Sequence, residues 1–220
     1  MQFKRVTLFS GHYGSGKTNI AINYALYMKS IGLNVVVADL DIVNPYFRTK
    51  DSQSELEQLG IHLIVSKYAN SAVDFPAIPQ EMYSVVDDRS KYAVMDIGGD
   101  DRGALALGRY APAIVEENNF ENLFVANMYR PLTRTANEAL EVLHEVECAG
   151  GIKITGIVNN SNLGEETDDQ TVLDSLDFIN ELSEMSNLPI KFTSVKANIA
   201  SSLEGKIDNI LPMKLQKKII

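Results

Sequence analysis

The chain has 220 residues, of which 45% are hydrophobic and 22% are charged. This composition is typical of a folded domain with a sizeable core and argues against disorder. The formal net charge of −9 argues against a nucleic-acid backbone as the main partner, because no surplus of lysine and arginine exists to neutralise phosphates. The single cysteine, Cys148, excludes an internal disulfide and a Cys-x-x-Cys metal site, and we expect it to be buried at a helix end.

Short apolar segments alternate with longer segments of helical periodicity along the whole chain. Most of the short segments are apolar at every position, as in a parallel sheet that helices cover on both faces. The segments that we predict as strands are 6–9, 35–38, 61–65, 92–95, 123–126 and 154–158.

The intervening segments predict helices over 18–30, 135–148 and 167–186. The second of these begins with a capping box, Thr135-Ala136-Asn137-Glu138. The alternation of strands and helices predicts a single α/β domain over residues 1–220, with a doubly wound, mostly parallel sheet. Ligands bind such sheets at the carboxyl ends of the strands.

The ends of the chain carry no pattern that points to a membrane. The N-terminal residues run directly into a strand-like segment without a signal-peptide core, so we expect a cytoplasmic protein. The final residues predict a short amphipathic helix with Leu211, Leu215 and Ile219 on one face. A helix this short more often packs on its own domain than on a membrane, so membrane binding is not expected.

The segment after the first strand has the pattern of a phosphate-binding loop. Residues 11–18 read Gly-His-Tyr-Gly-Ser-Gly-Lys-Thr, and a helix follows them. The glycines permit a tight turn that points backbone N–H groups inward, and the helix adds the positive end of its dipole. Lys17 can reach the β- and γ-phosphates of a nucleoside triphosphate, and the Thr18 hydroxyl can ligate Mg²⁺. The predicted nucleotide-binding residues here are Gly11, His12, Tyr13, Gly14, Ser15, Gly16, Lys17, Thr18 and Asn19.

Two further strand ends carry carboxylates. Asp39 and Asp41 follow the strand 35–38 on the same side, so one can join the magnesium shell while the other orients the attacking water. The alternative is that they cap the following turn. Asp96 ends the strand 92–95 and is predicted to hold Mg²⁺ through water, while Gly98 and Gly99 bring backbone N–H groups to the γ-phosphate.

These segments together resemble the MinD/ParA/Mrp and cobyrinate-synthetase-like group of P-loop ATPases. The resemblance covers about the first 100 residues, and the segment 157–160, Ile-Val-Asn-Asn, is similar to the family's base-contacting strand end. It implies a SIMIBI-type P-loop NTPase fold of about seven or eight strands, ATP with Mg²⁺, and in many members ATP-dependent homodimers. Carried over by position, Lys17 is a phosphate residue, Thr18 and Asp96 are magnesium residues and Asp41 orients the water. Asn159 or Asn160 would contact adenine.

One position departs from the family pattern. Many of these ATPases carry a second lysine after the first glycine of the loop, which reaches the partner's phosphates across the dimer. His12 stands there, and at a usual pKa of about 6.5 it is mostly neutral at pH 7. A group acting in trans would then be another residue, such as Arg102 or Arg109, although a structural role is favoured for both. Arg130 faces the pocket or a partner, or it stabilises a turn.

The predicted function follows from these residues. GTP specificity usually relies on an Asn/Thr/Ser-Lys-x-Asp strand end, whereas Asn159-Asn160-Ser161-Asn162 offers amides that can pair with adenine. We therefore expect a slow Mg²⁺-dependent ATPase that acts as a switch on a client protein. The alternatives are a small-metabolite kinase or ligase of the cobyrinate or dethiobiotin-synthase type, and a nickel-type GTPase chaperone.

Overall fold

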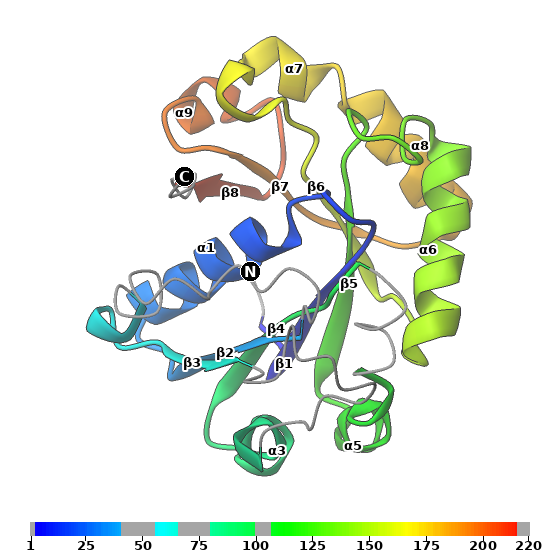
Figure 1. Cartoon of the computed structure of the whole chain (residues 1–220). Helices are drawn as coiled ribbons and strands as arrows, with labels where there is room; N and C mark the ends of the chain where they lie inside the picture. Colours follow the sequence, from blue (N-terminus) through cyan, green and yellow to red (C-terminus); the bar gives the residue numbers. More distant parts are fainter. Residues whose placement is uncertain (1–2, 41–55, 66–79, 100–106, 215–220) are drawn as a thin grey trace, which may run out of the picture.

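Within the residues that the structure describes, eight strands form one sheet in which every neighbouring pair is parallel (Figure 1). The computed structural model describes residues 3–40, 56–65, 80–99 and 107–214. The strand order is β3-β2-β4-β1-β5-β6-β7-β8. The strands are β1 (Val6–Ser10), β2 (Val35–Asp39), β3 (His62–Val65), β4 (Tyr92–Asp96), β5 (Phe120–Ala126), β6 (Gly156–Asn159), β7 (Ile190–Lys196) and β8 (Ile210–Met213).

Helices cover both faces of this sheet (Figure 1). The first helix, α1, packs on one face, while α3, α5, α6 and α8 pack on the other. The sheet is therefore doubly wound, as the alternating pattern predicts. The helices are α1 (Lys17–Ser30), α3 (Gln80–Asp87), α5 (Ala111–Glu117), α6 (Ala136–Gly150), α7 (Asp169–Leu173), α8 (Leu176–Ser186) and α9 (Ala200–Leu203), with a 3₁₀ turn, η2 (Gly164–Glu166).

Continuous apolar strands supply both cores. In β2, Val35 and Val37 pack toward α1, whereas Val36 and Ala38 pack with α3 and α5. Successive side chains of a strand point to opposite faces, so every position of a strand that is buried on both sides favours an apolar residue. Burial of each such valine contributes about 1.5–3 kcal/mol. A strand that is buried on both faces is therefore apolar at every position, and this pattern predicts it from the sequence.

The predicted strands are confirmed to within three residues at each end, but two strands were missed. The segment 123–126 is the second part of β5, and 154–158 begins two residues before β6. Neither β7 nor β8 was predicted. The amphipathic helix expected from Leu211 is wrong, because Leu211 and Met213 are buried in β8 while Pro212 between them is exposed. This is a strand period, and Leu215 and Ile219 lie outside the described residues.

The helix expected over 167–186 is divided into α7 and α8. The break falls at Ser175, whose side chain is fully buried. The Ser175 hydroxyl donates to the Val172 carbonyl at 2.7 Å and accepts a hydrogen bond from Asn159 Nδ2 at 2.8 Å. A serine that bonds to nearby backbone in this way competes with the helix ladder. Cys148 is another correction, because it is exposed on α6, outside the buried stripe of that helix.

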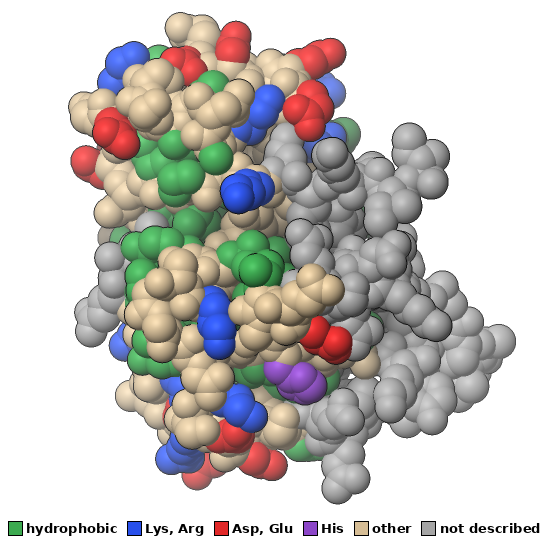
Figure 2. All heavy atoms as spheres, turned by 90° about the vertical axis from the view of Figure 1, so that its left-hand side faces the viewer, with side chains coloured by type: hydrophobic (Ala, Val, Ile, Leu, Met, Phe, Trp, Pro, Cys, Tyr) green, Lys and Arg blue, Asp and Glu red, His purple; other side chains and the backbone are tan. Residues whose placement is uncertain are grey.

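The surface shows a mixture of charges. On the face drawn in Figure 2, the lysine and arginine side chains of the described residues are dispersed among apolar and polar ones. Among the described residues, no helix is both long and apolar enough to cross a membrane.

A buried ion pair ties the amino end of β1 to the helices beneath it. The Arg5 side chain is 6% exposed, and its guanidinium donates through Nε and Nη2 to the Glu117 carboxylate at the end of α5. Its Nη1 also donates to the Val85 carbonyl of α3 at 3.0 Å. A guanidinium with this many partners holds three elements in one arrangement.

We predict that Arg5→Met lowers the free energy of unfolding by about 3–5 kcal/mol, because it leaves the Glu117 carboxylate buried without its partner. Urea denaturation measures this loss. The control is Lys91→Met, which removes a half-exposed pair with Asp88 at 2.9 Å and should leave the stability nearly unchanged, because solvent screens such a pair. Equal stability of the two variants would show that the Arg5 pair does not hold the fold.

Candidate nucleotide-binding site

The loop of residues 11–16 lies where the order of the strands reverses. It follows β1, which is flanked by β4 on one side and β5 on the other. The chain runs from β1 outward to β2, then to β3, and returns to place β4 beside β1. In open α/β sheets this reversal leaves a crevice at the carboxyl ends of the strands, and ligands bind there.

The loop is a tight turn that leads into α1. Ser15 N donates to the His12 carbonyl at 3.2 Å, and Gly16 adopts a left-handed conformation with φ of 93° directly before the helix. A Cβ at Gly16 would lie 2.3 Å from Asn160 Nδ2, so glycine is required by both the backbone and the space. Because α1 begins at Lys17, the positive end of its dipole faces the loop.

Lys17 folds back over the loop that precedes it. Its side chain is buried, and Nζ donates to the His12 carbonyl at 3.0 Å. A buried ammonium needs such acceptors, and the phosphates of a nucleotide are stronger ones. The structure thus places the lysine inside the cradle that residues 11–16 form.

Three oxygen-bearing side chains converge below the loop. Thr18 Oγ1 donates to Asp96 Oδ2 at 2.5 Å. Asp39 and Asp96 are both buried and lie opposite each other in the register of β2 and β4. One hydroxyl and two carboxylates are the hard oxygen donors that Mg²⁺ prefers, so the described residues fit this ion. The three residues that the sequence proposed for a metal are therefore brought together.

Gly99, three residues after the end of β4, packs directly against the phosphate-binding loop. A Cβ at this position would lie 2.7 Å from the backbone nitrogen of Tyr13 and 3.0 Å from Lys17 Nζ. Distances this short leave no room for any side chain, so the backbone of the loop and the backbone after β4 touch. The contact explains why glycine follows the strand here, and it couples the two motifs physically.

The two asparagines proposed to contact adenine are engaged inside the protein. Asn160 Nδ2 donates to the Ser15 carbonyl at 2.6 Å, and its Oδ1 accepts from Ser194 Oγ at 2.5 Å. Asn159 is fully buried and bonds through both ends of its amide, to Ser175 Oγ and Ser161 N. Asn160 therefore braces the loop, and an adenine contact by either residue stays a prediction that requires these bonds to rearrange.

Ser194 was missed by the sequence reasoning. It lies in β7, a strand that was not predicted, and it reaches the loop only through Asn160. A single serine in the mixed segment 190–196 gives no local signal, because the contact depends on the pairing of β6 with β7.

Four further residues were proposed for roles at the site. Asp41 and Arg102 lie outside the described residues. Arg109 and Arg130 are exposed, and the backbone of Arg130 forms a turn with Asn127. Tyr129 in this turn donates from its hydroxyl to the Thr171 carbonyl at 2.8 Å, and burial raises the pKa of the phenol.

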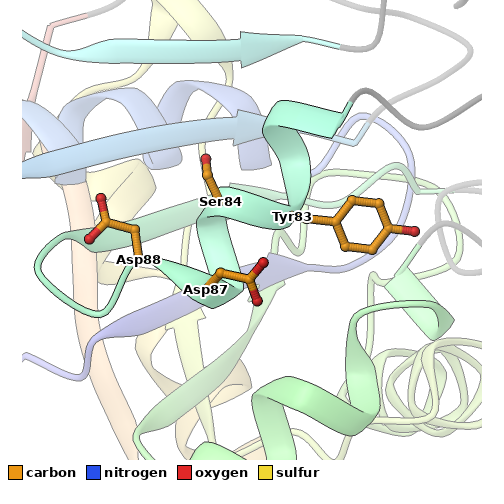
Figure 3. Close-up of a pocket in the computed structure, with 4 residues that line it drawn as sticks. All are labelled: Tyr83, Ser84, Asp87 and Asp88. Carbon is orange, nitrogen blue, oxygen red and sulfur yellow. The ribbon is translucent and has the colours of Figure 1, made fainter.

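A second hollow lies on α3, and none of the residues that line it belongs to the phosphate-binding loop (Figure 3). Tyr83, Ser84, Asp87 and Asp88 line it, and in Figure 3 the side chains of Tyr83 and Asp88 point in opposite directions. The Asp88 carboxylate accepts from Ser90, and this hydrogen bond together with Lys91 lowers its pKa to about 2. Side chains that diverge and are already partnered do not form a convergent binding site.

The chain has the α/β fold of SIMIBI-type P-loop NTPases, with the glycine-rich loop between β1 and α1. A scan against protein-family models and a search of curated proteins gave no significant match. Solved structures with this fold include the cell division protein FtsY of Thermotoga maritima (20% identity, TM-score 0.58, 89% of this chain and 62% of that one). They also include the signal recognition particle receptor FtsY of Elizabethkingia anophelis in complex with GDP (18%, 0.55, 89% and 58%). A third is FlhF complexed with GTP and Mg²⁺ (14%, 0.51, 86% and 64%).

These likenesses establish the fold and leave the narrower grouping open. The chain spans about three fifths of the length of the two FtsY structures. These two structures are of a signal recognition particle receptor and of a cell division protein, and not of the MinD/ParA/Mrp group that the motifs resemble. Membership of that group, like the choice between ATP and GTP, stays a prediction.

We predict that Gly99→Ala weakens binding of a magnesium–triphosphate at least about tenfold, because the added methyl group displaces the backbone at Tyr13. Calorimetric titration with a non-hydrolysable ATP analogue measures the affinity. Gly108→Ala is the matched control, since a Cβ there meets no heavy atom within 4 Å. Equal affinity of both variants would mean that the contact between the two loops does not shape the phosphate site.

Proposed function

We propose that this chain is a Mg²⁺-dependent ATP-binding protein that hydrolyses ATP slowly and acts as a switch on a client protein. The observation that carries the proposal is the hydrogen bond between Thr18 and Asp96 beside the phosphate-binding loop. Lys17 donates to the His12 carbonyl of the same loop. A hydroxyl at a helix start, joined to a carboxylate at a neighbouring strand end, is the arrangement that magnesium–triphosphate sites use.

The residues of the chain divide the work of holding the nucleotide. Lys17 and the backbone N–H groups of residues 11–18 would hold the phosphates, and Thr18, Asp39 and Asp96 would hold the metal. When bound, the metal neutralises negative charge on the phosphoryl oxygens. The backbone of Gly99 contacts the loop at Tyr13, and Asn160 donates to the loop from the end of β6. Asp41 is proposed to orient the attacking water.

The charge around Lys17 supports slow turnover. His12 stands where related ATPases place a second lysine, and Arg109 and Arg130 are exposed. The described residues thus bury no second permanent cation beside Lys17. A positive group supplied in trans is worth about 10³–10⁵ in rate in related phosphoryl transfers, so turnover stays slow until a partner provides one.

Exposed apolar side chains near the carboxyl edge support a partner. Tyr13, Leu132 and Leu163 are 64%, 59% and 47% exposed, and they follow β1, β5 and β6 respectively. Leu132 also has a φ of 65°, which is strained for a residue with a side chain of this size. Apolar groups presented on loops beside a nucleotide site are suited to contact a client or a second copy in a nucleotide-dependent manner.

We predict that Lys17→Ala lowers the affinity for magnesium–ATP at least about a hundredfold, because charge-assisted bonds to the phosphates are lost. Isothermal titration of the wild type, Lys17→Ala and the exposed control Lys153→Ala measures the change. Competition between labelled ATP and unlabelled GTP then tests the base. If Lys17→Ala binds magnesium–ATP as tightly as the wild type, the loop is not the phosphate-binding site. If GTP displaces labelled ATP at a lower concentration than unlabelled ATP does, the preferred ligand is GTP.

A further inference from the structure

A hollow of about 100 Å³ lies beside the phosphate-binding loop, on the side of α6. One wall is formed by His12 and by the backbone of Gly98 and Gly99. The opposite wall is the C-terminal half of α6, where Val142 and Glu145 line the space. The hollow therefore joins the loop that holds Lys17 to a helix that the nucleotide site does not otherwise use.

The α6 wall of this hollow is electronegative. Glu145 carries the negative charge, and it has no ion pair or hydrogen bond to another side chain within the part of the chain that the structure describes. Ala149 and Gly150 in the last turn of α6 also line the hollow, and this turn contains no basic residue. The partial negative charge at the end of a helix adds to the carboxylate and favours a cation.

The lining of the hollow also suits a long basic side chain. Apolar groups of Val142, Val146 and Leu107 line it, and no lysine or arginine does so among the described residues. Lysine and arginine bury their aliphatic stems on such surfaces while the charged head reaches a carboxylate. His12 at the opposite wall has Nδ1 within 2.9 Å of the Tyr13 carbonyl, so when Nδ1 carries the proton, Nε2 is an acceptor.

We propose that this hollow receives a lysine or arginine side chain of the client protein, anchored by Glu145 beside the phosphate-binding loop. The inference rests on the proposed nucleotide function and names the chemistry of the partner. The entering side chain adds a permanent positive charge beside His12 and the phosphate-binding loop. A protein with a formal net charge of −9 also attracts a basic partner surface over a longer range.

Binding of the basic side chain and binding of the triphosphate should be coupled. Without nucleotide, the ammonium of Lys17 repels a second cation nearby, whereas a bound triphosphate attracts it. The basic group and the triphosphate must therefore strengthen each other's binding, and by linkage the coupling is reciprocal. We expect at least about a fivefold tighter association of the cation in the presence of magnesium and triphosphate.

The test uses n-propylguanidinium, the side chain of arginine without its backbone, and n-propylurea as its uncharged analogue. Each is titrated into ¹⁵N-labelled protein with magnesium and a non-hydrolysable ATP analogue, and amide shifts of Gly98, Gly99 and Ala149 report on binding. The guanidinium should saturate these shifts, and Glu145→Gln should weaken its binding at least about fivefold. Glu141→Gln, an exposed glutamate of α6 that does not line the hollow, should leave binding unchanged.

Several outcomes would overturn the inference. Equal binding of n-propylurea would show that the hollow does not select for charge. Equal loss of guanidinium affinity in Glu145→Gln and Glu141→Gln would show that the overall negative charge of α6, and not a contact with Glu145, attracts the cation. Dimerisation that requires triphosphate and is abolished by Glu145→Gln would place a second copy in the hollow instead of a client. If the triphosphate itself does not bind in these samples, the proposed function fails as well. If it binds and the guanidinium does not, only this inference fails.

Discussion

The hydrogen bond between Thr18 and Asp96 depends on the order of the strands and in turn positions the rest of the site. Thr18 lies in the first turn of α1 and Asp96 at the end of β4, 78 residues further along the chain. They meet only because β4 is inserted between β2 and β1. The same insertion sets Asp39 opposite Asp96 and brings Gly99 under the loop. A single topological feature thus assembles oxygen donors for a metal, a close backbone contact and the cradle around Lys17.

The features that the sequence predicts well are those that depend on local chemistry. The loop 11–18, the buried strands β1 to β4 and the capping box at Thr135 each follow from a short pattern, and the capping box is present in the structure. The parts that failed depend on contacts between distant residues. Ser175 ends a helix because Asn159 reaches it from β6, and Leu211 forms a strand because β7 pairs with its backbone. The position of Asn160 in the sequence predicts a contact with adenine, whereas in the structure its amide forms hydrogen bonds with the Ser15 carbonyl and the Ser194 hydroxyl.

The distribution of charge links the site to a partner. The protein is acidic overall, yet the loop concentrates positive charge from Lys17 and from the start of α1. On the other side of the same loop, Glu145 and the end of α6 form an electronegative wall. A triphosphate seated between these regions would be attracted by one and would make the other more receptive to a cation. This arrangement suits a protein whose turnover waits for a basic group from outside, as its exposed Arg109 and Arg130 also suggest.

We propose that Thr18, Asp39 and Asp96 form a magnesium site for a nucleoside triphosphate. The most direct measurement is an experimental structure with Mg²⁺ and a non-hydrolysable ATP analogue. We expect Thr18 Oγ1 to exchange its bond to Asp96 Oδ2 for a bond to the metal, with both carboxylates turned toward that ion. Lys17 Nζ should move from the His12 carbonyl to phosphate. A structure in which the nucleotide binds elsewhere, or in which Thr18 keeps its bond to Asp96 while the triphosphate is bound, would contradict it.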